Sequence, residues 1–199
     1  MPLQFAPTLP AEEQARANFY GLLARLLYRP PDGGLLEALA SAGEIEAEDE
    51  TLAAAWRALC EAAAAAEAEA LREEFDAAFI GTGRAPVTLY ASAYSIRYSN
   101  EAPLAELRGE LAALGLARRA EAAEPEDHIA ALCDAMRHFI AADARPLEEQ
   151  RRFFRRWIYP VVEPLCAAIE KSEHTAFYKT VARFAKAFFS LEHSAFEML

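Results

Sequence analysis

Residues 10–28 read PAEEQARANFYGLLARLLY and decide how the rest of the chain is interpreted. Apolar side chains recur in this stretch at three- and four-residue spacings, which places them on one face of an α-helix: Ala15, Phe19, Leu22, Leu23, Leu26 and Leu27. Pro10 suits the first turn of a helix, and Pro30-Pro31 cannot continue one. The stretch therefore predicts an amphipathic helix whose apolar face lies against a core.

The same spacing recurs along the chain and predicts further helices. They are expected from Asp32 to Gly43, over 48–80 with a break near 63–67, and over 103–115, 125–143, 146–159, 165–169 and 175–191. Pro160 and Pro164 are expected to interrupt the pattern between two of them. No segment shows the period-two alternation of a strand. We therefore expect an all-α fold, a single-domain bundle of about seven to nine helices over residues 1–199.

The composition fits one folded domain. With 199 residues, 54% of them hydrophobic, the chain can bury a substantial core without disulfide bonds. Cys60, Cys133 and Cys166 lie far apart in apolar helical patterns and are expected to be buried thiols in a reducing compartment. Residues 1–10 do not resemble a signal peptide, and no stretch approaches ~18 uninterrupted apolar residues. We expect a cytoplasmic protein that is not inserted in a membrane.

The negative charge is concentrated in the first part of the chain. The net charge is −11, and residues 1–144 carry 24 Asp and Glu against 11 Lys and Arg, whereas residues 145–199 carry 7 against 9. An acidic surface repels nucleic acid and anionic lipid and favours encounters with basic partners. Acidity also serves solubility alone, so the charge by itself does not identify a ligand.

Residues 81–100 break the helical pattern and contain no acidic residue. A connection of this length inside a compact domain is usually functional or mobile. Gly81 and Gly83 allow unusual backbone conformations, and Pro86 stiffens the path. Tyrosines recur every four residues, at Tyr90, Tyr94 and Tyr98. A short helical turn would align them. Their rings would then either cover the core, with the hydroxyl groups in water, or form one wall of a semi-apolar groove.

The segment Glu124-Pro125-Glu126-Asp127-His128 is expected to begin the helix over 125–143. Proline in the first turn, with acids beside it, suits a helix N-terminus, whose free N–H groups and dipole favour carboxylates. Capping alone explains these residue types. Asp127 could in addition accept hydrogen bonds from a ligand guanidinium, and His128 could be a pH-sensitive donor.

Metal and catalytic motifs find little support. His128 and His138 are ten residues apart on one expected helix, about 15 Å along its axis, so they cannot share an ion. Asp134 and His138 are four residues apart, but no third ligand lies near them in sequence. No Gly-x-Ser-x-Gly turn is present, no cysteine has a basic flank, and Gly81-Thr82-Gly83 falls short of a phosphate-binding loop. We expect neither a metal nor another cofactor.

The run Arg151-Arg152-Phe153-Phe154-Arg155-Arg156-Trp157 mixes basic and aromatic residues, as some nucleic-acid-binding surfaces do. On a helix, however, the three aromatic side chains fall on one face and the four arginines on the other. This is ordinary amphipathicity, and no nucleic acid is expected as a partner.

Several segments match one known family when they are taken in order. They are Phe75 to Ile80 followed by Gly81-Thr82-Gly83, then Pro86 and Tyr90-Ala91-Ser92-Ala93-Tyr94, then Glu124-Pro125-Glu126-Asp127-His128-Ile129, then Phe153-Phe154 and Pro160. Together they resemble the TorD/DmsD/NarJ family of cytoplasmic chaperones. The resemblance covers most of the chain and is weakest over residues 1–50.

The resemblance implies a chaperone, not an enzyme, that matures molybdenum-containing oxidoreductases. Such a chaperone binds the twin-arginine signal peptide of its client, or the apo form, and delays export until the cofactor is inserted. It implies contacts of Glu124, Asp127 and His128 with the basic part of the peptide. Contacts with the apolar part are implied for Phe79, Tyr90, Ser92 and Tyr94, with Gly81 and Pro86 in the same groove.

Two departures from the family pattern leave the client open. Ala91 stands where better-known members carry Glu, and Trp157-Ile158-Tyr159-Pro160-Val161 replaces a His-Leu-x-Pro-Trp segment. The chain is expected to be a monomer or a domain-exchanged dimer. The alternative from another functional class is a helical metal- or nucleotide-dependent hydrolase that uses Asp127 and His128.

Overall fold

The computed structural model describes residues 9–45, 49–81, 85–95, 103–118 and 122–199. Its helices are α1 (Ala11–Tyr28), α2 (Gly33–Ala40), α3 (Glu50–Ala64), α4 (Ala68–Phe75), α5 (Ser92–Ser95), α6 (Pro103–Ala113), α7 (Ile129–Ala141), α8 (Leu147–Phe153), α9 (Tyr159–Lys171) and α10 (Phe177–Glu197). Two π-helical turns, η1 (Asp76–Ile80) and η2 (Phe154–Ile158), follow α4 and α8. Over the described ranges no strand forms, which confirms the expected all-α fold.

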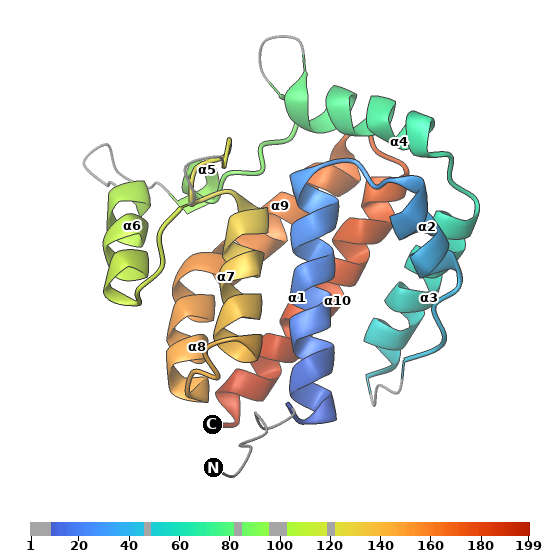
Figure 1. Ribbon diagram of the computed structural model, residues 1–199. Helices are drawn as coiled ribbons and strands as arrows, with labels where there is room; N and C mark the ends of the chain where they lie inside the picture. The colour runs from blue at the N-terminus through green and yellow to red at the C-terminus, as the bar shows by residue number, and fades with distance from the viewer. Residues whose placement is uncertain (1–8, 46–48, 82–84, 96–102, 119–121) are drawn as a thin grey trace, which may run out of the picture.

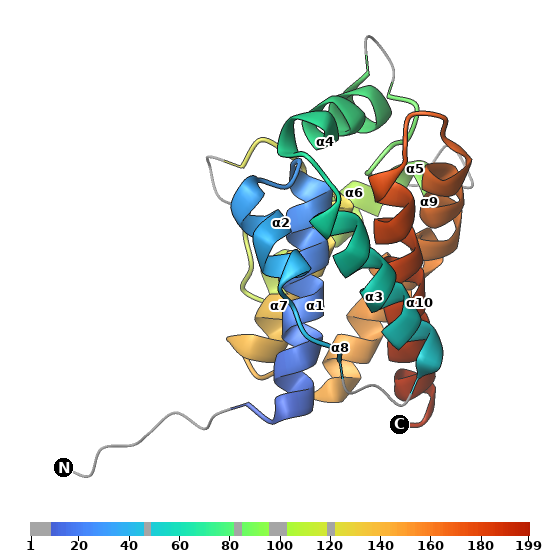
Figure 2. The same cartoon turned by 90° about the vertical axis from the view of Figure 1, so that its right-hand side faces the viewer.

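Helices α1 and α10 lie side by side in the middle of the bundle (Figures 1 and 2). α7 packs against α1, whereas α3 and α9 pack against α10, and α2 lies on α3. In both views α4 crosses one end of the bundle. The short α5 lies toward that end and contacts α9 and α6.

The first helix has nearly the bounds that its flanking prolines predict. Pro10 is the N-cap residue, one position before the helix, and the chain becomes extended at Arg29. Leu23, Leu26 and Leu27 are buried, as the apolar spacing predicts, whereas Ala15 is exposed and Tyr20, which the predicted face did not include, is buried. Phe19 packs against rings of α3 and α10, with its centroid 5.5 Å from that of Trp56 and 5.2 Å from that of Phe184. The apolar face of α1 therefore joins these helices in one aromatic cluster.

Residues 147–171 form one continuous helical run, so the interruption predicted at Pro160 and Pro164 is wrong. The π-helical turn η2 closes with a hydrogen bond from the Tyr159 N–H to the Phe154 carbonyl. Pro160 follows at the beginning of α9, where a missing N–H is tolerated. Pro164 lies inside α9 and has no N–H to donate to the carbonyl of Pro160, four residues earlier. Both prolines are exposed, so water can reach that carbonyl.

Helix α10 also exceeds its prediction, because it continues past residue 191 to Glu197. It begins without a side-chain cap of its own. Glu74 of α4 supplies one: its carboxylate accepts from the N–H groups of Ala176 at 2.8 Å, Phe177 at 3.2 Å and Tyr178 at 2.9 Å. These are among the N–H groups that a helix leaves unpaired at its start.

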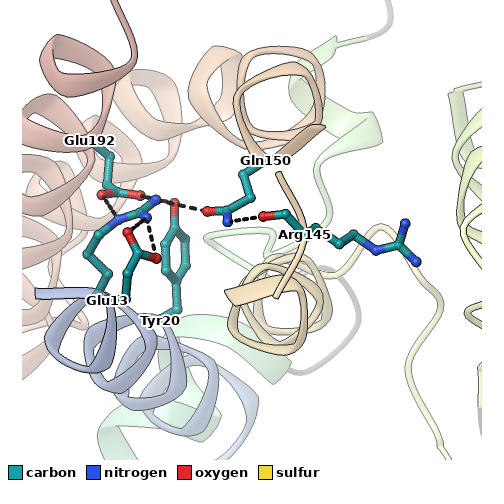
Figure 3. A network of polar contacts seen from close by, with 6 residues as sticks. Glu13, Tyr20, Arg145, Gln150 and Glu192 are labelled. Carbon is teal, nitrogen blue, oxygen red and sulfur yellow. Dashed lines mark hydrogen bonds and ion pairs between the residues drawn. The ribbon is translucent and has the colours of Figure 1, made fainter. Parts of the chain in front are cut away.

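A buried polar network joins α1, α8 and α10 (Figure 3). Glu192, only 4% exposed, accepts from Arg16 Nε at 2.7 Å and Nη2 at 2.9 Å, and from the Tyr20 hydroxyl at 2.9 Å. Arg16 also donates to both oxygens of Glu13 and, at 3.2 Å, to Oε1 of Gln150. The charges are taken out of water but paired, which is the condition for tolerating them in a core.

Candidate functional site

The acid-free segment and the Glu-Pro-Glu-Asp-His segment meet through their backbones. Tyr90 and His128 pair as an isolated antiparallel β-bridge. Two backbone hydrogen bonds of 2.8 Å flank it, from Ala91 to Asp127 and from Ile129 to Leu89. The structure thus brings together the two segments that the sequence places in one groove. We call residues 89–92 with 124–129 the bridge junction.

Asp127 holds the junction together from inside. Its side chain is 4% exposed, and its Oδ2 accepts a short hydrogen bond from the Ser92 hydroxyl. The Ser92 N–H approaches the same oxygen at 3.4 Å. The other oxygen, Oδ1, is buried and has no hydrogen-bond partner among the described residues. Asp127 therefore faces the loop that carries Ser92, and its geometry is that of a positioning residue.

His128 is the N-cap residue of α7. Its Nδ1 accepts from the Ala130 N–H at 3.2 Å, so the neutral ring carries its proton on Nε2. The helix begins at Ile129, and the prediction that Pro125 occupies its first turn is wrong, because the Ile129 N–H donates to the Leu89 carbonyl and not to a carbonyl of residues 124–128. Burial lowers the pKa of His128, although nearby carboxylates act in the opposite direction.

Glu124 and Tyr90 form the outer, accessible part of the junction. The Tyr90 hydroxyl donates to Glu124 Oε2 at 2.6 Å. This hydrogen bond, together with partial burial and the negative charge nearby, raises the pKa of Tyr90 to about 12. Tyr90 is 37% exposed and Tyr28 is 46% exposed. Their rings meet the His128 ring edge-on at centroid distances of 5.4 Å and 6.2 Å.

The other candidate residues lie deeper or further along the loop. Phe79 is buried against Phe75 and Tyr178, so it belongs to the core. Tyr94 is half-buried, and its hydroxyl donates to the Thr88 carbonyl at 2.8 Å. Gly83 and Tyr98, which the sequence also singles out, lie outside the described residues.

The backbone at the start of this loop adopts an unusual conformation at Gly81, as the sequence predicts. Gly81 ends η1 with φ 63° and ψ 167°, a conformation that essentially only glycine adopts. Its N–H donates to the Asp76 carbonyl at 2.7 Å and closes the π-helical turn. Pro86 is exposed, and the Val87 N–H donates to the Ala78 carbonyl at 3.0 Å, so the loop is fastened to η1 before it reaches the junction.

The outer surface of the junction combines the half-buried carboxylate of Glu124 with the exposed ring of Tyr90, and the exposed ring of Tyr28 lies beside it. A carboxylate accepts hydrogen bonds from guanidinium groups, and aromatic faces attract the same cations. Sequence reasoning missed Tyr28, which ends the first helix and comes close to the junction only through the packing of α1 on α7. It also missed Arg108, which donates to Glu126 Oε2 at 2.8 Å and so engages the middle acid of the segment.

Metal-binding and nucleophilic arrangements are not found among the residues that the structure describes. No group of three or more His, Cys, Asp or Glu side chains there could hold a metal ion. His138 lies 3.2 Å from Asp143, and Asp134 pairs with Arg137, so the candidate pair is engaged elsewhere. Burial raises the pKa of Cys133 and Cys166, while Cys60 is only half-buried. Cys133 and Cys166 are core residues as predicted, whereas the predicted burial of Cys60 is wrong.

Comparisons with known proteins identify a family and a similar fold. A family model described as nitrate reductase delta subunit matches residues 45–167. A solved structure of a candidate redox enzyme maturation protein from Archaeoglobus fulgidus is similar in fold, with a TM-score of 0.58 at 19% identity over 95% of this chain and 98% of that one. No curated protein matches the chain. Among the described helices, none is long and apolar enough to cross a membrane.

Proposed function

The chain belongs to the nitrate reductase delta subunit family, and on that premise we propose that it binds the twin-arginine signal peptide of a molybdenum-containing oxidoreductase before export. Members of this family are maturation chaperones and not catalysts, which overturns the alternative of a hydrolase that uses Asp127 and His128. The partner is accordingly a redox enzyme. The peptide, the metal of the client and the contact residues are our proposal.

The observation that carries the proposal is the contact between Tyr90 and Glu124. It sets a half-buried carboxylate beside an exposed ring at the place where two loop segments meet. A twin-arginine peptide offers two adjacent guanidinium groups followed by an apolar segment. One guanidinium replaces the phenol as the partner of Glu124, because it carries a full positive charge and can donate two parallel hydrogen bonds to the carboxylate, where the phenol donates one. The second stacks on Tyr28 or Tyr90.

The remaining candidate residues support this surface. Asp127 and Ser92 hold the loop against α7, and His128 fixes the N-terminus of α7 between two tyrosine rings. The apolar part of the peptide extends over the loop that begins at Gly81 and carries Pro86 and Tyr94, with Phe79 beneath it. The affinity is moderate, because the peptide is ordered on binding and has to be released later.

The wider role follows the same proposal. A chaperone that covers the signal peptide in the cytoplasm keeps the client from export while the molybdenum cofactor is inserted. The described helices share one hydrophobic cluster, which supports a single chaperone domain over residues 1–199. In this role the chain works as a monomer or as a domain-exchanged dimer, without a cofactor of its own.

A titration of the full chain with a labelled twin-arginine peptide tests the proposal. The Lys-Lys version of the peptide should bind about 5–10-fold more weakly, because lysine cannot form the paired hydrogen bonds of a guanidinium. Glu124→Gln should weaken the twin-arginine peptide by about 10-fold, the equivalent of one charge-assisted hydrogen bond. Glu61→Gln makes the same change of charge at an exposed position of α3 and should leave the affinity unchanged.

Two results would contradict the proposed function. Equal binding of the arginine and lysine peptides would show that guanidinium recognition plays no part. Equal weakening by Glu124→Gln and Glu61→Gln would show that only the overall negative charge matters, and the bridge junction would lose its role.

A further inference from the structure

A second polar site lies on α8 and η2, away from the bridge junction. A surface hollow of about 370 Å³ is lined there by Glu148, Arg151, Arg152, Arg155 and Arg156. Its volume lies within the range of small-ligand sites. Four arginines and one glutamate give the lining a formal charge of +3, in a chain whose net charge is −11. Glu197, Glu106 and Glu110 lie outside the lining and pair with Arg155 and Arg156, so the uncompensated positive charge of the hollow centres on Arg152.

The helix geometry places the four arginines in two adjacent rows. Residues four apart lie on one helical face, so Arg151 aligns with Arg155 and Arg152 with Arg156. On the other face Phe153, Phe154 and Trp157 are buried, and they fix the orientation of the run. Amphipathicity explains why this face is polar, but it does not explain four charges of one sign, since like charges at this spacing destabilise a helix by about 0.2–0.5 kcal/mol per pair.

Ion pairs engage three of the four arginines and leave the fourth available. Arg151 pairs with Glu148 at 2.8 Å, Arg155 with Glu197 at 3.3 Å, and Arg156 with Glu106 at 2.6 Å and Glu110 at 3.2 Å. Most of these side chains are largely exposed, and such pairs contribute little and can exchange partners. Arg152 is exposed and has no partner among the described residues. It is the guanidinium most available to a ligand.

We propose that this arginine hollow binds a short acidic peptide segment with two or more carboxylates. Arginine rows match carboxylates because each guanidinium can donate two parallel hydrogen bonds. A nucleic acid fits less well, since a long polyanion would extend beyond the hollow over a surface on which residues 1–144 carry the excess of acid. A segment of a few residues stays within the basic area.

The position of the hollow makes it independent of the proposed signal-peptide site. In Figures 1 and 2 α8 lies toward one end of the bundle and α5, next to the junction, toward the other. The two sites also require ligands of opposite charge. In the described part of the chain Arg152 has no contact with the junction, so loss of acidic-peptide binding in an Arg152 variant is distinguishable from loss of signal-peptide binding.

Fluorescence anisotropy of the full chain tests the inference with a labelled hexapeptide in which four of the six residues are glutamate. The control peptide has glutamine at those four positions. The Glu peptide should bind at least 10-fold more tightly than the Gln peptide and weaken as salt is raised. Arg152→Gln should lower its affinity about 5-fold and Arg152→Glu more, with an unchanged circular dichroism spectrum. Arg57→Gln, an exposed arginine of α3, is the matched control and should bind like the unmodified chain.

Three outcomes would overturn the inference. The first is similar binding of the Glu and Gln peptides, and the second is similar effects of Arg152→Gln and Arg57→Gln. The third is tighter binding of a single-stranded oligonucleotide or of inorganic phosphate than of the Glu peptide, lost in Arg152→Gln, which would assign the hollow to another class of ligand.

Discussion

Glu192→Gln should cost the chain a large part of its stability, because Glu192 is the carboxylate in the buried network of α1, α8 and α10. The substitution keeps the volume of the side chain but removes its charge and turns one oxygen into an N–H donor that faces the donors of Arg16. The side chains of Arg16 and Glu192 are only 13% and 4% exposed, so water cannot replace the lost partner.

The magnitude follows from what remains around Arg16. Removing one partner of a buried ion pair costs about 3–5 kcal/mol. Glu13 keeps its hydrogen bonds of 2.8 Å and 2.9 Å to the guanidinium, so the charge is not left alone. We therefore expect the lower end of this range, about 3 kcal/mol of unfolding free energy, or a fall in Tm of roughly 6–12 °C for a chain of this size.

Urea unfolding followed by circular dichroism at 222 nm measures this loss, with Glu13→Gln as the matched control. The Glu13 side chain is 25% exposed and pairs within one helix, so its substitution should cost about 1 kcal/mol or less. A loss for Glu192→Gln that does not exceed the loss for Glu13→Gln would refute the reasoning, because the two carboxylates would then be equivalent despite their different burial.

Three further predictions concern single contacts. Glu74→Gln should lower the unfolding free energy by about 1–2 kcal/mol, because it weakens the cap of α10, whereas Glu73→Gln, an exposed neighbour, should change it by less than about 0.5 kcal/mol. Ser92→Ala should cost about 1–3 kcal/mol, because it strips the buried Asp127 of its hydroxyl partner; Ser194→Ala, which loses an exposed hydroxyl on α10, should stay within about 0.5 kcal/mol. His128 is held neutral by burial and its pKa is lowered, so the unfolded chain takes up the proton first as the pH falls below about 6.5. The unmodified chain should therefore lose more stability between pH 7.5 and 5.5 than His128→Asn, which retains a capping side chain but does not titrate; equal losses in urea unfolding at the two pH values would contradict this role.

The sequence predicts helices well where local signals and packing agree. Pro10 and Pro30-Pro31 bound α1 because they act on the backbone next to them, and the apolar spacing in between selects the buried face. The start of α7 was misplaced because Pro125 satisfies the same local rule. What moves the start to Ile129 is a hydrogen bond to Leu89, a contact between segments that no local pattern encodes.

The candidate site was predictable in outline but not in detail. The unusual composition of residues 81–100 and the acids of 124–127 point to two unusual segments, and the structure joins them. Burial then separates Asp127, which turns inward, from Glu124, which is only half-buried, although both are acids in one short motif. Tyr28 could not be assigned to the site from sequence, because its place there depends on how α1 packs on α7.

The cap that Glu74 places on α10 joins two helices that are far apart in the sequence, so it can form only after both have been synthesised. Glu74 and Tyr178 are 104 residues apart, so the ribosome completes α4 long before the helix that it caps exists. Until then the contacts of α3 and α9 with α10 are also missing. Closing so long a loop has an entropic cost, which is offset only when α10 packs against α3 and α9. The bundle therefore cannot finish folding until α10 has been made, and the nascent chain leaves the aromatic rings that pack on α10 uncovered until then.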